Sequence, residues 1–262
     1  MVIIITGASK GIGFALAESF AKQGHQVYGF SRHTAESSNF TSLSVDVTDK
    51  EQIQQAVSAV IAKEGRIDVL INNAGMGMVG AVEDTTKEDI HKLFDLNLAG
   101  PVQMMSAVLP QMRTQRSGRI INISSIGSEM GLPFRGFYSA SKSALDKVTE
   151  AMRYEIKNWN IQATILHLGD IKTNIAEGRV RTKVSDAYTV VFNKIYDLMN
   201  VHVDHGNEPS EVADYIDLLL KKNNWKAHYY FGKFGQKIGV PLKWILPQNF
   251  YENLMRKYSQ MD

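Results

Sequence analysis

The segment VIIITGASKGIGF at residues 2–14 decides the fold class of this chain. Its first five residues, Val2–Thr6, are mainly β-branched and predict a buried strand, whereas the apolar periodicity that begins at Phe14 predicts a helix. Three glycines occupy the turn between the two elements. Glycine lets a backbone approach a pyrophosphate closely, and the first turn of a helix offers unpaired N–H groups to anionic phosphate. The segment therefore indicates a nucleotide-binding strand, turn and helix.

The same alternation of strand and helix patterns continues along the chain. Short β-branched runs predict strands, and longer segments with apolar residues at three- and four-residue steps predict helices. The strand segments are Val2–Thr6, Gln26–Phe30, Thr41–Val45, Val69–Ile71, Arg119–Ile123, Thr164–Leu168 and Tyr229–Phe231. The helical segments are Phe14–Gln23, Lys50–Lys63, Lys87–Leu98, Val102–Arg113, Tyr138–Trp159 and Pro209–Lys221. We therefore predict an α/β, doubly wound fold with a seven-stranded parallel sheet, helices on both faces and functional residues just after the strands.

Composition places the chain among ordinary globular proteins. Its 262 residues are 44% hydrophobic and carry a formal net charge of +2, which gives no reason to expect nucleic acid as a partner. Because the chain has no Cys, disulfides, thiolate catalysis and Cys-ligated metal sites are excluded. The apolar start is too short for a signal peptide, and no run reaches the roughly 18 residues of a membrane span. We expect a single cytoplasmic domain.

Five short motifs then follow one another in a particular order. The glycine loop has the spacing Gly-x-x-x-Gly-x-Gly; after it come Asp46-Val47, Asn72-Asn73-Ala74-Gly75, a lone Asn97, and Ser125 followed thirteen positions later by Tyr138-Ser139-Ala140-Ser141-Lys142. Together the motifs resemble those of the short-chain dehydrogenase/reductase family. The resemblance covers residues 1–232, for which it implies a Rossmann-type NADP-binding and catalytic domain, with residues 174–206 as a substrate-covering lid within it.

The candidate catalytic residues are Ser125, Tyr138, Lys142 and Asn97. Tyr138 and Lys142 lie four positions apart on a predicted helix, so they share a face, and the ammonium is expected to lower the phenol pKa from its usual value near 10. Such a tyrosine can exchange a proton near neutral pH, while Ser125 donates a hydrogen bond to the substrate oxygen. The resemblance implies that Lys142 also binds the nicotinamide ribose and that Asn97 holds a water linking Lys142 to solvent.

The choice of cofactor depends on the end of the second predicted strand. No acidic residue stands there to hold a ribose 2′-hydroxyl, and Arg32 is of the type that accommodates the 2′-phosphate of NADP. Lys10 adds a second cation, so we expect NADP(H) rather than NAD(H). Two alternatives stay open: both cations could be solvated surface charges, and Glu36 could hold a ribose hydroxyl. The candidate cofactor-binding residues, several of them implied by the resemblance, are Gly7, Ser9, Lys10, Gly11, Ile12, Gly13, Ser31, Arg32, Asp46, Val47, Asn73, Ala74, Gly75, Tyr138, Lys142, Ile171 and Thr173.

Apolar side chains in and near the predicted lid favour a hydrophobic ketone or alcohol as substrate. The candidates are Met76, Met130, Phe134, Ile175, Tyr188 and Phe192, which could also be ordinary packing residues. The basic run Arg179–Lys183 could meet an anionic group, although a solvated surface is the simpler interpretation. We predict no metal site, because His202, Asp204 and His205 lack the pattern of a ligand set and His167 is expected to be a core histidine.

Residues 233–262 form a predicted C-terminal helical extension, with an apolar stripe after Pro247 that suits a first helical turn. This extension could cover the substrate, pack on another subunit or lie on a membrane surface with its basic residues outward. Packing on its own protein is the simplest interpretation. The family resemblance implies a homodimer or homotetramer.

These observations predict an NADP(H)-dependent oxidoreductase that interconverts a carbonyl and a secondary alcohol on a hydrophobic small molecule. Two alternatives are kept. One is an NADP(H)-binding regulator without turnover. The other is a nucleotide-sugar epimerase or dehydratase, although such enzymes usually have a longer sugar-binding lobe and a Gly-x-x-Gly-x-x-Gly loop, neither of which is present.

Overall fold

A parallel seven-stranded sheet forms the middle layer of the molecule. The structure, a computed structural model, describes residues 1–173, 178–259 and 261. The strand order is β3-β2-β1-β4-β6-β7-β9, and every neighbouring pair is parallel. These strands are β1 (Val2–Thr6), β2 (Gln26–Ser31), β3 (Thr41–Ser44), β4 (Val69–Asn72), β6 (Gly118–Ser125), β7 (Ile161–Leu168) and β9 (His228–Phe231).

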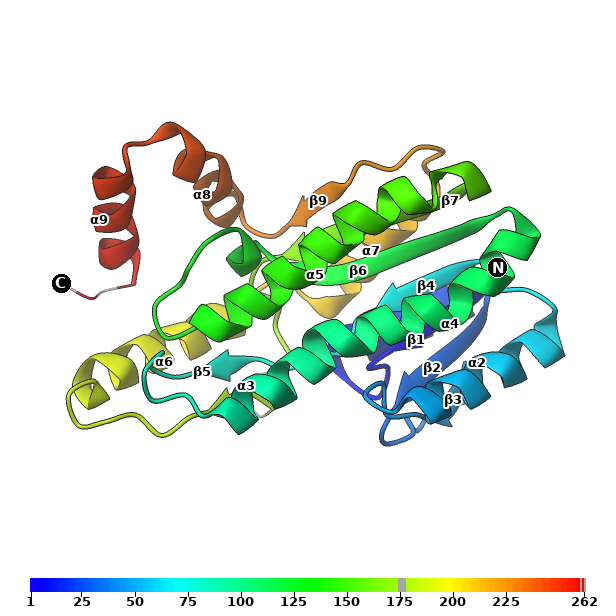
Figure 1. The fold of residues 1–262 in the computed structure, drawn as a ribbon, viewed down its shortest axis with the longest axis horizontal. Coiled ribbons are helices and arrows are strands. Elements are labelled where there is room, and N and C mark those ends of the chain that lie inside the picture. The colour runs from blue at the N-terminus through cyan, green and yellow to red at the C-terminus, as the bar shows by residue number, and fades with distance from the viewer. Residues whose placement is uncertain (174–177, 260, 262) are drawn as a thin grey trace.

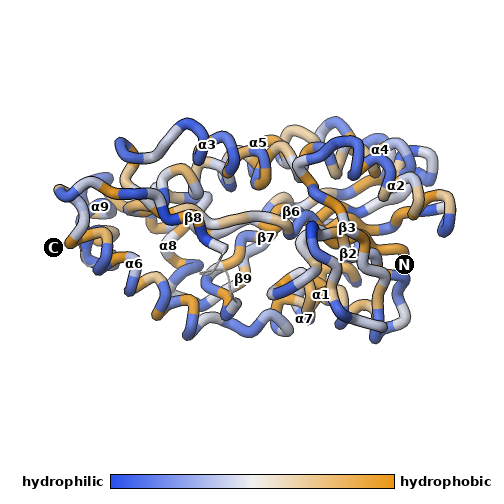
Figure 2. The backbone as a smooth tube through the Cα atoms, turned by 90° about the horizontal axis from the view of Figure 1, so that it is seen from below, coloured by the Kyte–Doolittle hydropathy of each residue, from blue (hydrophilic) through white to orange (hydrophobic). Residues whose placement is uncertain are grey.

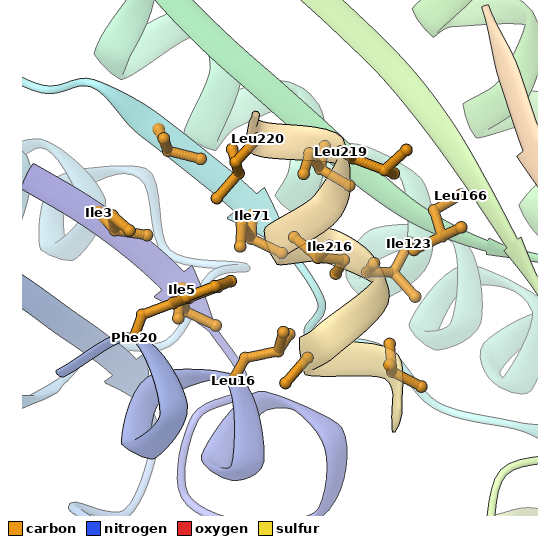
Figure 3. Close-up of a cluster of buried hydrophobic side chains, with 14 of the residues drawn as sticks. Ile3, Ile5, Leu16, Phe20, Ile71, Ile123, Leu166, Ile216, Leu219 and Leu220 are labelled. Atoms are coloured by element: carbon orange, nitrogen blue, oxygen red, sulfur yellow. The ribbon is translucent and has the colours of Figure 1, made fainter. Parts of the chain in front are cut away.

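Helices cover both faces of this sheet (Figure 2). The helices α1 (Gly11–Lys22) and α7 (Pro209–Leu220) lie on one face, and α2 (Lys50–Glu64), α4 (Gly100–Gln115) and α5 (Gly136–Glu155) lie on the other. Alternate side chains of β1 enter different cores: Ile3 and Ile5 pack with α1 and α7, whereas Ile4 packs with α2 and α4. Figure 3 shows the first of these cores, where Leu16 and Ile216 lie between the two helices and the sheet. Burial on both faces explains why the strands are almost continuously apolar.

The predicted α/β, doubly wound fold is confirmed, and every predicted strand is present. The chain runs from β1 outward to β3 and then returns to β4 on the other side of β1, which creates the topological switch point where such sheets bind ligands. One predicted helix differs. The segment Lys87–Leu98 is not one helix: α3 (Lys87–Phe94) leads into a π-helical turn, η1 (Asp95–Ala99), before α4 begins.

Three further elements went unpredicted near the substrate side. Two short strands, β5 (Met78–Val79) and β8 (Val180–Arg181), form a separate parallel pair, and α6 (Thr189–Asp204) follows them. Two 3-10 turns, η2 (Ile126–Glu129) and η3 (Lys157–Trp159), complete the described elements between β6 and β7. Within the described ranges, no helix is both long enough and apolar enough to cross a membrane.

The C-terminal extension forms two helices, α8 (Phe234–Ile245) and α9 (Gln248–Tyr258), beside α6 at the end of the molecule away from the N-terminus (Figure 1). It packs on its own protein, because Tyr251 is buried and its hydroxyl contacts the Met130 sulfur at 3.4 Å. Part of its apolar surface stays exposed, Trp244 to 76%.

Candidate active site

A cleft of about 530 Å³ opens at the carboxyl ends of the strands, on the two sides of the switch point. Its walls come from the loops after β1, β2, β3, β4, β6 and β7, together with α5 and α6. All of the predicted cofactor residues except Gly13 line it, and so do Ser125, Tyr138 and Lys142. The structure therefore brings together residues that are up to 166 positions apart in the chain, from Gly7 to Thr173.

The glycine loop closes the phosphate end of the cleft. Gly7 and Gly11 have φ values of +68° and +58°, in the left-handed region that favours glycine. Gly13 lies behind the loop, where a Cβ atom would collide with the Gly7 carbonyl oxygen and the Asn73 amide. Lys10, which precedes α1, makes no side-chain hydrogen bond to the helix, so the N–H groups of its first turn remain available to an anion. This cradle fits the pyrophosphate of a dinucleotide.

Asn73 holds the glycine loop to the end of β4. Its side-chain amide donates to the carbonyl oxygens of Thr6 at 2.9 Å and Gly7 at 3.3 Å. The Thr6 hydroxyl oxygen accepts from the backbone N–H groups of both Asn73, at 3.0 Å, and Ala74, at 2.9 Å. These bonds fix the relative positions of the two loops on either side of the switch point.

The two predicted selectivity cations, Lys10 and Arg32, are both exposed and both line the cleft. Glu36, the alternative ribose ligand, is not among the residues that line this cleft; it lines a separate hollow beside α1. Asp46 keeps one carboxylate oxygen engaged with Thr48, accepting from its N–H at 2.9 Å and its hydroxyl at 2.8 Å. At the cleft wall, the charge that directly follows β2 is therefore positive, that of Arg32.

Ser125 and Tyr138 lie together at the other end of the cleft. Ser125 ends β6, and its hydroxyl oxygen accepts from the Gly127 N–H at 3.0 Å. Burial raises the pKa of Tyr138, while a hydrogen bond with Ser125 and the nearby charges of Arg135 and Arg179 act in the opposite direction. The pKa of Tyr138 was expected to be lowered by Lys142, but it is raised, because the effect of burial is larger than that of the positive charges of Arg135 and Arg179.

Lys142 lies one helical turn from Tyr138, at the cleft wall. Its ammonium donates to the carbonyl oxygen of Ile123 at 2.9 Å, and its side chain is almost fully buried. Burial lowers its pKa to about 8, against an opposing effect of Asp146. A lysine with such a pKa loses much of its charge just above neutral pH.

Asn97 is placed by the π-helical turn rather than by a regular helix. It is fully buried and does not line the cleft directly. Its side-chain oxygen accepts from the Met76 N–H at 2.9 Å, and its amide donates to the Met76 carbonyl at 3.0 Å and to the Ser141 hydroxyl at 3.1 Å. Single π-helical turns often mark functional sites. Here the turn points a polar side chain between the loop after β4 and the helix that carries Tyr138.

The predicted substrate residues are only partly brought to the cleft. Met76 lines it, whereas Met130 packs beneath the C-terminal helices. Phe134 packs on both Tyr188 and Phe192, with ring centroids 6.0 and 5.3 Å apart, and none of the three is among the residues that line the cleft. Ile175 lies outside the described residues.

Four residues of the substrate side are not among the predicted substrate candidates, although Arg179, Met199 and Val203 fall within the predicted lid, residues 174–206. From α6, Met199 and Val203 line the cleft, and Arg135 and Arg179 lie near enough to Tyr138 to lower its pKa. Arg179 is held by Asn200, to whose side-chain oxygen it donates at 3.0 Å. Its basic run was noticed in the sequence, but nothing in that run indicates proximity to Tyr138.

Comparisons with known proteins agree with this geometry. Residues 1–183 match the family model described as short chain dehydrogenase. The chain is 37% identical over 259 residues to a 3-ketodihydrosphingosine reductase of Bacteroides thetaiotaomicron, covering 97% of this chain and 96% of that protein. A probable short-chain type dehydrogenase/reductase of Helicobacter pylori is 32% identical over 260 residues, covering 97% of this chain and 96% of that protein.

Among solved structures, a short-chain dehydrogenase from Streptomyces avermitilis superimposes with a TM-score of 0.84 at 31% identity, covering 98% of this chain and 97% of that one. The protein ElxO with NADP bound superimposes with a TM-score of 0.72 at 27% identity, covering 87% of this chain and 94% of that one.

Proposed function

Because the chain belongs to the short-chain dehydrogenase/reductase family, and so is an NAD(P)-dependent oxidoreductase acting on CH–OH groups, we propose that it uses NADPH to reduce a long-chain ketone related to 3-ketodihydrosphingosine. The observation that carries the proposal is the arrangement of the cleft. Ser125, Tyr138 and Lys142 lie at one end, and the glycine loop with Lys10 and Arg32 lies at the other.

In this reaction, bound NADPH supplies the hydride. The Ser125 hydroxyl donates a hydrogen bond to the substrate carbonyl oxygen and holds it beside Tyr138. Tyr138 transfers its phenolic proton to that oxygen as the carbon is reduced, which leaves a tyrosinate and a secondary alcohol. Arg135 and Arg179 stabilise the tyrosinate, since their charges lower the pKa of Tyr138. In alcohol oxidation the same tyrosinate removes the hydroxyl proton.

The preference for NADP(H) is supported by the charges at the end of β2. A 2′-phosphate placed between Lys10 and Arg32 gains two cationic partners, whereas the lining residues that directly follow β2, Arg32 and His33, offer no carboxylate to a bare ribose hydroxyl. Arg32→Asp is the direct test: we expect the Kd of NADPH to rise at least about tenfold more than that of NADH, since like charges would then face each other. Equal losses for both cofactors would refute the preference. Glu36→Gln, outside the cleft, serves as the control.

The substrate class is supported by the relative from Bacteroides thetaiotaomicron and by the apolar side of the cleft. Met76, Met78, Val79, Met199 and Val203 supply this surface, and methionine adapts to flexible aliphatic ligands. The test follows NADPH oxidation with 3-ketodihydrosphingosine, with a short methyl ketone and with an aldohexose. We expect kcat/KM to be highest for the long-chain ketone. A preference for the sugar or the short ketone would refute this substrate class.

The presence of Ser125, Tyr138 and Lys142 together in the cleft favours an enzyme over a regulator that only binds the cofactor. Turnover in the same ketone assay distinguishes the two. The family resemblance further supports a homodimer or homotetramer, which light scattering of the purified chain would test.

A further inference from the structure

A second group of titratable side chains lies behind Ser125, outside the cleft. It joins Glu129 of η2, His167 of β7 and His228 of the edge strand β9. The register of β7 and β9 pairs His167 with Tyr230, so His228, two residues earlier, projects from the same face of the sheet. His167 is fully buried, whereas His228 and Glu129 are half-buried. The three donor atoms all lie within 4.8 Å of one another.

The ring nitrogen of His167 that points away from the other two residues, Nδ1, must carry a hydrogen. Its Nδ1 lies 3.2 Å from the Ser125 carbonyl oxygen and 3.1 Å from the Ser128 hydroxyl oxygen. A carbonyl oxygen can only accept, and Ser128 already donates its own hydrogen to the same carbonyl at 2.7 Å. The Asp146 carboxylate, 3.9 Å from Nδ1, favours the same proton position. Nε2 of His167 therefore presents a lone pair.

The ring nitrogen of His228 that points away from the group, Nε2, also has an acceptor as its neighbour. Its Nε2 lies 3.3 Å from the Glu150 carboxylate, which can only accept when ionised, and Glu150 is itself paired with Lys147 at 2.7 Å. When the hydrogen of His228 is on Nε2, toward Glu150, its Nδ1 also presents a lone pair. The two lone pairs face each other across 2.9 Å, and a Glu129 carboxylate oxygen lies 3.7 Å from His167 Nε2. Three electron-rich atoms converging in this way call for a positive occupant.

That occupant can be an added proton or a metal ion. His167 is fully buried, and a charge buried on one ring without a full set of partners costs free energy. A metal ion replaces the proton and accepts all three donors.

We propose that His167 Nε2, His228 Nδ1 and Glu129 bind a divalent transition-metal ion of the Zn²⁺ class. Two imidazoles and a carboxylate suit Zn²⁺ and its neighbours. Bonds of about 2.0–2.1 Å in a tetrahedral site separate the ligand atoms by about 3.3 Å. His167 Nε2 lies 2.9 Å from His228 Nδ1 and 3.7 Å from Glu129, and all three donor atoms lie within 4.8 Å of one another, so side-chain rotations are needed to close the set around an ion.

Each proposed ligand also has an outer partner that orients it, as metal ligands usually do. Ser125 holds His167, Glu150 holds His228, and the Tyr230 hydroxyl donates to the same Glu129 oxygen at 2.7 Å. The ion would tie η2, which directly follows Ser125, to β9. Because the Glu129 carbonyl oxygen accepts from Lys243 of α8 at 2.6 Å, the tie would extend to the C-terminal helices. The expected role is structural: it fixes Ser125 and the C-terminal helices.

The test is metal binding by the full-length chain after treatment with a chelator. Titration calorimetry with Zn²⁺ should give one equivalent per chain, Co²⁺ should give the intense visible absorption of a tetrahedral site, and Zn²⁺ should raise Tm. His228→Gln and Glu129→Gln should abolish all three signals. Glu150→Gln, which removes only an outer partner, should weaken binding by about 10 to 100-fold.

The matched control is His205→Gln, an exposed histidine whose Nδ1 contacts the Val201 carbonyl and which lies outside the group. It should leave binding unchanged. Circular dichroism checks that each variant is folded. If one of His228→Gln and Glu129→Gln fails to fold, the other alone is enough for the test. A wild-type chain that binds no Zn²⁺, and so holds a shared proton only, would overturn the proposal. So would binding that persists in a folded His228→Gln or Glu129→Gln variant.

Discussion

Replacing Gly7 by alanine tests whether the glycine loop requires close backbone packing as well as an unusual conformation. Gly7 has a φ of +68°, and a Cβ atom there would lie 2.9 Å from Ala74 Cα and 3.0 Å from the Asn73 amide nitrogen. Gly65 has nearly the same φ, +70°, but a Cβ atom there meets nothing within 4 Å. Gly65→Ala is therefore a control for backbone strain alone.

The two variants should differ by a calculable amount. An alanine in the left-handed region costs about 1–2 kcal/mol, which both variants lose. Crowding against rigid backbone adds about 1–3 kcal/mol at Gly7 only, for a total of about 2–5 kcal/mol. Urea unfolding measures these losses. NADPH titration by fluorescence should show weaker binding for Gly7→Ala and unchanged binding for Gly65→Ala. Equal unfolding losses for the two variants, with NADPH affinity intact in both, would refute the packing argument.

Three further perturbations probe the catalytic end of the cleft. Arg179→Met should move the acidic, ascending limb of kcat/KM for alcohol oxidation to higher pH, because it removes a charge that lowers the pKa of Tyr138. Arg181→Met, whose side chain contacts Asn193, should leave that limb in place. Lys142→Met should abolish turnover yet stabilise the fold by up to about 3 kcal/mol at pH 7, since a buried lysine with a pKa of about 8 instead of 10.5 opposes folding. Between pH 8 and 10.5 the unfolded wild-type chain binds a proton at Lys142 that the folded chain does not, so the stability of the wild type rises with pH across that window. The stability advantage of Lys142→Met should therefore disappear above it. Urea unfolding at several pH values measures this change. Asn97→Ala should leave the part-buried N–H and C=O of Met76 without their side-chain partner and cost about 1–3 kcal/mol in thermal unfolding; an unchanged Tm would contradict this role.

The sheet and the position of the cleft were predictable because the strands are buried on both faces and the functional motifs follow them directly. Each β-branched run marked one strand, and parallel strands bring their carboxyl ends to one edge of the sheet. The π-helical turn at Asn97 was not predicted, because the apolar residues of Lys87–Leu98 were interpreted as one continuous helix and single π-helical turns are rare.

Contacts between distant segments limited the rest of the sequence-based prediction. The spacing of Tyr138 and Lys142 indicated one charge beside the phenol, but not the burial that dominates its pKa. Phe134 and Phe192 were both candidates for covering the substrate, and the structure packs them on each other, outside the residues that line the cleft. His167 was expected to be a core histidine, and it is buried and hydrogen-bonded; its proximity to Glu129 and His228 depends on the pairing of β7 with β9.

The most direct test of the central claim is the rate of NADPH oxidation with 3-ketodihydrosphingosine by the wild-type chain and by Tyr138→Phe. Phenylalanine keeps the ring and removes the proton that the reaction needs. We predict turnover by the wild type, loss of at least about 1000-fold in kcat for the variant, and an NADPH Kd that changes little, since general acid catalysis commonly contributes about 100 to 10,000-fold. Undiminished turnover by a folded Tyr138→Phe variant would contradict the account.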